Sequence, residues 1–139
     1  MICLTIIAIA AVVASTVTTR ATGNPFEKPT EMRCTCYMDS GAMASGKQTR
    51  PFVCAAKKEW IGCVACLYDV NEDGSIGDFI GYYEILDTGA GIDTDGDGIG
   101  DSIRNGQSID IWQPDKESCN AWIKAHGDYV FVYIVEGVG

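Results

Sequence analysis

"YEILDTGAGIDTDGDGIGDSIRNGQSIDIWQP", residues 83–114, places an aspartate- and glycine-rich stretch between two short runs of β-type residues. The flanking runs belong to the segments 79–86 and 108–112, whose β-branched and aromatic side chains favour strands. Residues 87–102 between them contain no aromatic side chain, and Asp and Gly are residues that form turns. The stretch therefore predicts two strands joined by a long polar loop.

The rest of the chain repeats this pattern of short strands separated by Gly, Asp and Asn. Further β-type runs occupy 32–38, 50–56, 63–70 and 129–135. The last run, "YVFVYIV", is apolar on both faces, which is typical of a central strand. Six short strands in one chain favour a closed barrel, so we expect a mainly β fold, a small six-stranded β-barrel.

One helix is predicted, over 115–127. Cys119, Trp122, Ile123 and His126 recur at the spacing of one helix face, and Gly127 is placed to end the helix. His126 would then lie at the helix C-terminus, where a cation is favoured.

Composition limits the classes of function. A chain of 139 residues has room for one ordinary domain, and its net charge of −9 argues against nucleic acid, which needs clustered Lys and Arg. The same charge disfavours binding to anionic lipid. Concentrated carboxylates suit a divalent cation instead.

The first twenty residues are apolar or uncharged up to Arg20. They predict either a secretory signal peptide, with cleavage after Ala14, or an uncleaved membrane anchor. Residues 21–30 contain two prolines without periodicity and are predicted as a linker, so the domain would span 31–139. We therefore expect a secreted or cell-surface protein with no membrane contact beyond this N-terminal segment.

Cysteine usage agrees with export. Six cysteines follow the N-terminal segment, an even number that predicts up to three disulfides: Cys34, Cys36, Cys54, Cys63, Cys66 and Cys119. The alternative is a zinc site built from the Cys34-x-Cys36 and Cys63-x-x-Cys66 pairs. A redox role for the second pair lacks the βαβ context that would support it.

Two aspartate-rich segments have the spacing of calcium loops. Calcium takes six to eight oxygens, and oxygens at positions 1, 3, 5 and 7 converge when Gly at position 6 allows a sharp turn. The predicted ligands are Asp69, Asn71, Asp73 and Ser75 in the first segment, and Asp93, Asp95, Asp97, Ile99 and Asp101 in the second. Neither segment has the Glu of an EF-hand at position 12. The alternatives are magnesium, and turns without any ion.

Without the second calcium loop, "YEILDTGAGI…SIRNGQSIDIWQP" resembles the signature of the 3D domain family, D-T-G-G-x-I-x-G-x-x-x-D-[IL]. The upstream segment "SGAMASGKQTRPFVCAAKKEWIGCVACLY" and the closing helix and strand are similar to the same family, over about residues 34 to 136. The resemblance implies a double-psi β-barrel that acts at the bacterial cell wall. The family includes membrane-bound lytic murein transglycosylases.

The resemblance assigns roles to individual residues. Asp87 matches the second of the three family aspartates and Asp110 matches the third, which resembles the catalytic acid of the transglycosylases. The position of the first aspartate falls at Ala55 or Ala56. Asp110 would protonate the leaving oxygen, with its pKa raised beside two isoleucines, and Asp87 would orient the sugar or hold a turn.

Trp112 is a candidate sugar-stacking platform, with packing at the barrel rim as its alternative. The expected partner is peptidoglycan or another wall glycan, and the expected cofactor is calcium, one or two ions. Three functions stay open: a lytic enzyme acting on glycan strands, a non-catalytic wall-binding module, and a structural surface protein assembled through its calcium loops.

Overall fold

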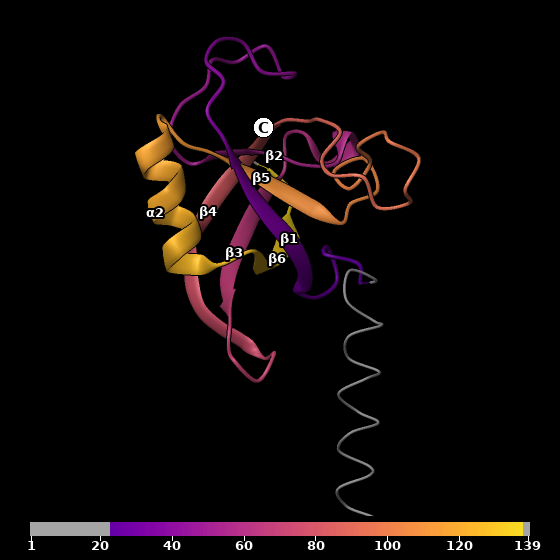
Figure 1. Ribbon diagram of the computed structural model, residues 1–139, viewed down its shortest axis with the longest axis vertical. Helices are drawn as coiled ribbons and strands as arrows, with labels where there is room; N and C mark the ends of the chain where they lie inside the picture. The colour runs from indigo at the N-terminus through magenta and orange to yellow at the C-terminus, as the bar shows by residue number, and fades with distance from the viewer. Residues whose placement is uncertain (1–22, 138–139) are drawn as a thin grey trace, which may run out of the picture.

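The computed structural model describes residues 23–137 and shows six strands that close into a barrel, with one α-helix against its side (Figure 1). The predicted mainly β fold is confirmed at this level. The elements are β1 (Thr30–Tyr37), β2 (Val53–Ala55), the short 3₁₀ helix η1 (Lys58–Trp60), β3 (Val64–Val70), β4 (Ile76–Asp87), β5 (Ser108–Trp112), α2 (Lys116–His126) and β6 (Tyr129–Val135).

The strands follow the order β1-β5-β2-β4-β3-β6 around the barrel, and β6 returns to β1. Two pairs are parallel, β1 with β5 and β2 with β4, and the other four are antiparallel. Because the ring is closed, every strand has two neighbours and no edge is left unpaired. The run "YVFVYIV" forms β6, between β1 and β3, as its apolar character predicts.

The barrel interior is filled by alternate side chains of each strand. Cys54, Ile85 and Ile111 are fully buried, and they lie opposite one another on β2, β4 and β5. Strand residues between such positions face outward, because successive side chains point to opposite faces. This alternation decides which polar residues reach the outer wall.

Helix α2 begins and ends as its sequence predicts. Asp115 caps the N-terminus, where its carboxylate accepts a hydrogen bond from the Ser118 N–H at 2.7 Å. Gly127 ends the helix with a φ of 77°, a left-handed conformation that favours glycine. The buried face carries Cys119 and Trp122, and the Trp122 indole N–H donates to the Tyr83 hydroxyl at 3.4 Å.

Two features differ from the sequence-based expectation. Residues 58–60 form η1, which the sequence does not signal. The described part of the expected linker, residues 23–29, lies against the barrel: the Ile134 N–H donates to the Pro25 carbonyl at 2.8 Å, and the Phe26 ring meets Trp60 edge-on.

The predicted signal peptide or anchor lies outside the described residues. Among residues 23–137, no helix combines the length and apolar character needed to cross a bilayer.

Candidate functional site

The two candidate catalytic aspartates lie on strands that flank β2. In the sheet register, Ala55 of β2 is opposite Asp87 of β4 on one side and Asp110 of β5 on the other. Ile109 and Ile111 belong to the barrel core, so the Asp110 side chain between them points to the outer face. The fold therefore brings both carboxylates to one part of the outer wall, although 22 residues separate them in the sequence.

Asp110 is held in a partly desolvated position. Burial raises the pKa of Asp110 to about 6, against the opposing effect of a hydrogen bond from the Thr35 hydroxyl, which reaches Oδ1 at 2.9 Å. The negative charges of Asp39 and Asp87 add to the rise. A carboxyl group with this pKa is protonated in about a tenth of molecules at pH 7, far more than an ordinary aspartate, and can donate a proton.

Asp87 is held by three hydrogen bonds at the end of β4. Its Oδ1 accepts from the N–H groups of Ala44 and Thr88 at 3.0 and 2.9 Å, and its Oδ2 accepts from the Tyr37 hydroxyl at 3.2 Å. Burial and the adjacent Asp87 carboxylate raise the pKa of Tyr37 well above its usual range, so the phenol stays a donor. Asp87 thus ties the loop after β1 to the barrel, as the predicted turn-holding role requires.

Trp112 packs beside this wall. Its ring contacts a small apolar cluster formed by Met43, Val53 and Leu86, and its indole N–H donates to the Asp39 carbonyl at 2.7 Å. These contacts fix the loop 38–52 over the outer ends of β2, β4 and β5. The structure thus gives Trp112 a packing role, and sugar stacking by its exposed part stays a prediction.

The aspartate-rich loop is closed at its base by hydrogen bonds between its two ends. At its neck the Asp101 and Ser102 N–H groups donate to the Ile92 carbonyl, and the Ile92 N–H donates to the Ser102 hydroxyl at 2.8 Å. Gly91 has a φ of 84°, and a Cβ there would collide with Ser102 and Ile103. The tight neck explains why glycine occupies this position, and it lets residues 93–100 form a loop that does not disturb the barrel.

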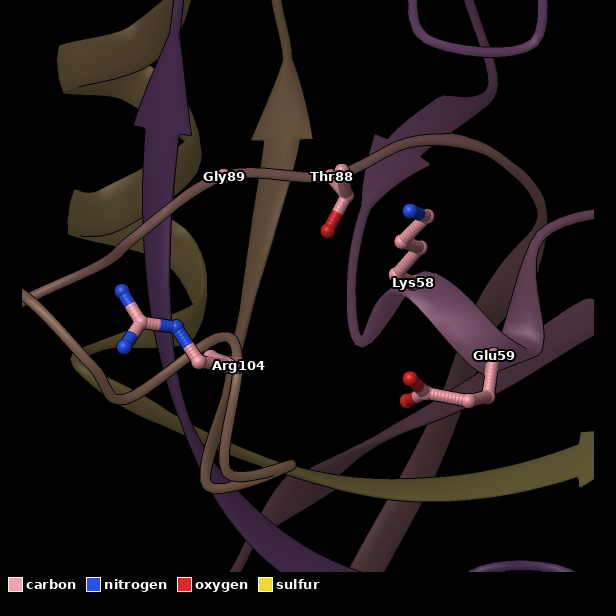
Figure 2. A pocket seen from close by; sticks show the side chains of 5 residues that line it. All are labelled: Lys58, Glu59, Thr88, Gly89 and Arg104. Atoms are coloured by element: carbon pink, nitrogen blue, oxygen red, sulfur yellow. The ribbon is translucent and has the colours of Figure 1, made fainter.

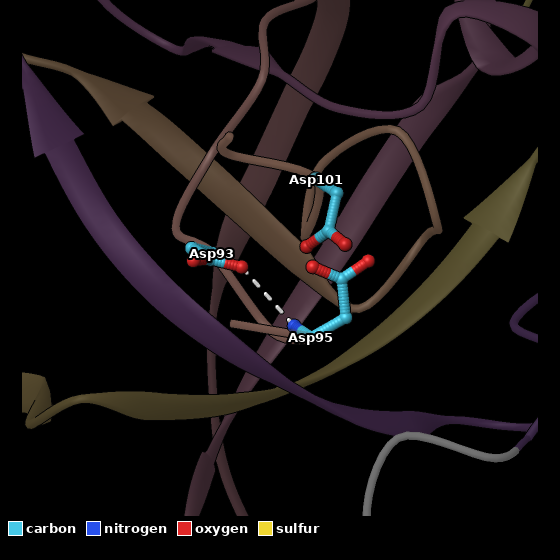
Figure 3. A group of neighbouring side chains, drawn as sticks. All are labelled: Asp93, Asp95 and Asp101. Atoms are coloured by element: carbon cyan, nitrogen blue, oxygen red, sulfur yellow. Dashed lines mark hydrogen bonds between the residues drawn. The ribbon is translucent and has the colours of Figure 1, made fainter. Parts of the chain in front are cut away.

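Three carboxylates converge inside this loop (Figure 3). The side-chain oxygens of Asp93, Asp95 and Asp101 lie within 4.8 Å of one another, and Asp101 is the buried member. Calcium–oxygen distances of about 2.3–2.6 Å place two ligands of one ion within about 5 Å of each other, so the spacing fits calcium. The predicted ligands Asp97 and Ile99 are not members of this group.

Hydrogen bonds and charges within the loop shift the pKa values of its carboxylates in different directions. Backbone N–H groups, the Gly98 N–H foremost, lower the pKa of Asp93, and the Thr94 hydroxyl and N–H lower the pKa of Asp101. The Asp97 N–H favours the charged form of Asp95, but desolvation and the neighbouring carboxylates outweigh it and raise the pKa of Asp95. A bound cation would relieve this repulsion.

The first aspartate-rich segment is a hairpin turn between β3 and β4. Asp69 pairs with His126, whose Nδ1 lies 2.8 Å from the Asp69 carboxylate, and the Asn71 amide donates to the Ser75 hydroxyl. Asp73 accepts from the Ser75 N–H at 2.9 Å. These side chains are engaged with one another or with α2, and the predicted calcium site here stays a prediction.

The six cysteines of the described residues are free thiols in the structure. Cys34 and Cys54 are fully buried in the barrel, whereas Cys36 on β1 shares a hydrogen bond with Cys119 on α2. Burial and this neighbour raise the pKa of Cys36 to about 12. Of the pairings that the sequence leaves open, the fold brings together Cys36 and Cys119.

The alternative zinc site is not formed. In the part of the chain that the structure describes, no group of three His, Cys, Asp or Glu ligand atoms other than the Asp93 group is close enough for one ion. Cys66 lies between Ala65 and Leu67, whose side chains enter the core, so Cys66 faces outward and away from Cys34.

A pocket beside Asp87 was not predicted from the sequence (Figure 2). It has a volume of about 270 Å³ and is lined by Lys58, Glu59, Thr88, Gly89 and Arg104. Its residues come from η1, the turn after β4 and the segment before β5, so only the tertiary structure assembles them. The D-T-G motif at Asp87 was the one signal that pointed toward this region.

Comparisons with models of known protein families, with curated proteins and with solved structures give no match.

Proposed function

We propose that this protein is a secreted or cell-surface protein that acts on bacterial wall glycan, with Asp110 as the general acid of a lytic transglycosylase-type cleavage. The observation that carries the proposal is the Asp110 carboxyl, whose pKa is raised to about 6 on the outer wall of the barrel, close enough to Asp87 to be affected by its charge. Cleavage of a glycosidic bond needs an acid that is protonated near neutral pH.

The reaction needs one proton donor. Asp110 protonates the glycosidic oxygen as the bond from that oxygen to the anomeric carbon breaks. The 6-hydroxyl of the same sugar then closes on the anomeric carbon and returns its proton to Asp110, which gives a 1,6-anhydro sugar without water. Asp87, held by Tyr37 and two backbone N–H groups, orients the sugar.

The double-psi form of the barrel belongs to the same proposal. It is supported by the two parallel pairs, β1 with β5 and β2 with β4, within an otherwise antiparallel ring. The aspartate loop fits the proposal as an insertion, because its neck closes between Ile92 and Asp101. We propose that Asp93, Asp95 and Asp101 bind calcium there, which would stabilise the loop next to the site.

A binding module without catalysis is the second candidate. The observation that favours it is Ala55, one of the two positions where the resembled family has its first aspartate. Ala55 lies between Asp87 and Asp110 in the sheet register. If this is the position of the family's first aspartate, a carboxylate is replaced by alanine at the centre of the wall. A barrel that retains only two of three aspartates could hold glycan without cleaving it.

Incubation of the purified protein with cell-wall sacculi separates the two candidates. The lytic enzyme releases anhydro-muropeptides, detected by mass spectrometry, and Asp110→Asn lowers their release by about 10²- to 10⁴-fold, as loss of general acid catalysis does. Lys124→Gln on α2 serves as the control and keeps full activity. Wall binding without anhydro products from the wild type would contradict the enzyme and leave the binding module.

A further inference from the structure

A group of aromatic side chains lies on the outer surface of the barrel, over the neighbouring strands β4, β3 and β6. Tyr68 of β3 lies in register between Phe79 of β4 and Phe131 of β6. Two residues away along β3, Tyr82 of β4 and Tyr133 of β6 lie on either side of the same β3 position. We call this set the aromatic face: Tyr68, Phe79, Tyr82, Phe131 and Tyr133.

The aromatic face points away from the core. Alternate residues of the same strands, such as Leu67 and Val132, are fully buried, and successive side chains of a strand face opposite ways. The rings also contact one another: the Phe79 centroid lies 5.4 Å from that of Tyr68 and 4.9 Å from that of Tyr82. Phe79 and Tyr82 are 48% and 64% exposed. Adjoining apolar side chains that stay exposed in this way mark an interaction surface.

The charges around the aromatic face are mostly negative. Residues 64–87, which form β3, the hairpin turn and β4, contain no Lys or Arg, and the residues that directly precede and follow β6 are acids. Arg50 is paired with Glu84 at 2.8 Å, and Arg33 lies one strand beyond the face, on β1. Charge complementarity therefore favours a cationic partner.

The same features argue against a second copy of this chain as the partner. In a symmetric dimer, the acids around one face would lie against the acids around the other. Three strands span only about 10 Å, whereas each partner of a stable dimer buries about 800 Å². The width suits one narrow polypeptide segment. Because the barrel is closed, this segment cannot pair as an added strand and must be held by side chains.

We propose that the aromatic face binds a basic, proline-rich segment of a partner protein. Such a segment forms a polyproline helix, which is ordered before binding and whose carbonyl groups are free to accept hydrogen bonds. Its prolines pack on the rings of Phe79 and Tyr82, and the tyrosine hydroxyls of the face donate to its carbonyls. Its arginines lie over the rings or pair with the surrounding acids. This inference does not depend on the glycan proposed for Asp110.

The test uses two synthetic peptides that differ in charge, four repeats of Arg-Pro-Pro and four repeats of Glu-Pro-Pro. In calorimetry, we expect the arginine peptide to bind the wild type at least about tenfold more tightly than the glutamate peptide. Phe79→Ser and Tyr82→Ser should each weaken its binding about three- to tenfold, because each removes one ring. Raising sodium chloride from about 0.05 M to about 0.5 M should weaken binding as well, because salt screens the surrounding acids.

Phe52→Ser is the matched control. Phe52 is 62% exposed, but its ring lies against Tyr83, outside the aromatic face, so this variant should bind the arginine peptide as the wild type does. Far-UV circular dichroism verifies that each variant is folded. No binding of the arginine peptide, equal binding of both peptides, or an equal loss in Phe52→Ser would overturn the proposal.

Two further results would assign the aromatic face to another occupant and would also overturn the proposal. One is binding of an uncharged chito-oligosaccharide that Tyr82→Ser abolishes. The other is self-association of the wild type in analytical ultracentrifugation that Tyr82→Ser abolishes.

Discussion

Asp110 shows how one strand position can give a carboxyl group an unusual chemistry. Its neighbours Ile109 and Ile111 fill the core, so the backbone holds Asp110 at the outer wall whether or not its charge is well solvated. Thr35 supplies one hydrogen bond, and the negative charges of Asp39 and Asp87 oppose ionisation. Partial burial beside other negative charges does not favour stability, and this combination is typical of functional carboxylates.

The raised pKa of Asp110 has a consequence for stability. Because its folded pKa, about 6, lies above the unfolded value of about 3.9, Asp110 favours folding fully below about pH 4, and this contribution is lost as the pH rises through 6. We therefore expect the change that Asp110→Asn makes in the free energy of unfolding to be more favourable at pH 8 than at pH 4. The difference between the two changes should be at most about 3 kcal/mol. Urea unfolding at both pH values measures this difference.

Asp78→Asn, at an exposed position of β4, is the control and should show no such difference. If Asp110→Asn destabilises the protein equally at pH 4 and pH 8, Asp110 is a hydrogen-bond anchor of the wall rather than a strained acid.

The same titration should appear in the lytic activity, which is expected to fall as the pH rises through about 6, because the general acid loses its proton.

At the scale of elements, backbone hydrogen bonds hold the shape of the aspartate loop, and we propose that a bound cation offsets the charge of its carboxylates. We expect EDTA to lower the melting temperature, since calcium at 100 times its dissociation constant stabilises the folded state by about 2.7 kcal/mol. Asp95→Asn removes a member of the carboxylate group and should abolish most of the calcium effect. Differential scanning calorimetry with and without calcium is the measurement.

The hairpin turn gives the matched control for this experiment. Asp73→Asn changes one exposed acid of the first aspartate-rich segment, and the calcium effect should persist in it if the Asp93 group is the site. A wild-type melting curve that EDTA does not change would exclude a stabilising ion in either loop.

Helix α2 and strand β1 are joined by a pair of thiols. Oxidation of Cys36 and Cys119 by a small disulfide such as oxidised glutathione would form one S–S bond and break the S–S bond of the oxidant, whose two sulfurs take up the two thiol protons and leave as two glutathione thiols. We expect peptide mapping to find this bond, and we expect it to stabilise the fold by about 2 to 4 kcal/mol. Because the pKa of Cys36 is raised to about 12, thiolate is scarce and the exchange should be slow at pH 7.

The distance between Cys34 and Cys54 excludes a disulfide bond between them. They lie on β1 and β2, with β5 between them, and are displaced by two residues in the register, so their Cα atoms are roughly 10 Å or more apart, beyond the reach of about 7 Å. Cys36→Ser should lose the stabilisation on oxidation, and Cys54→Ser should keep it. A Cys34–Cys54 peptide in the map would show that the barrel differs from this register.

At the scale of the molecule, residues 23–137 form one closed ring around a main core, with the small apolar cluster of Met43 outside it. Ile111 is fully buried and lies opposite both Cys36 and Cys54, so it contacts residues from several strands at once. Ile111→Ala should destabilise the protein by about 2–5 kcal/mol in urea unfolding, because the rigid ring cannot collapse into the cavity. Ile76→Ala, at an exposed hairpin position, should change stability by about 0.5 kcal/mol or less. Comparable losses in the two variants would contradict the description of one main core.

The sequence by itself determined the local structure of this protein. Short runs of β-branched and aromatic residues, separated by turn residues, located all six strands, and helix α2 was evident from the spacing of Cys119 and Trp122 and from Gly127 at its end. These signals are readable because they depend on residues that are close in the chain. The convergence of Asp93, Asp95 and Asp101 was predicted for the same reason, whereas Asp97 and Ile99 lie outside this group and their role as calcium ligands stays a prediction.

Tertiary structure alone decided which distant residues meet. The parallel pairing of β2 with β4 places Ala55 beside Asp87, and the pairing of β2 with β5 places it beside Asp110. The same closure assembles the pocket of Lys58 and Arg104 and brings Cys36 to Cys119. No local pattern encodes these contacts, because strand order and register come from how all six apolar faces are buried together in one core.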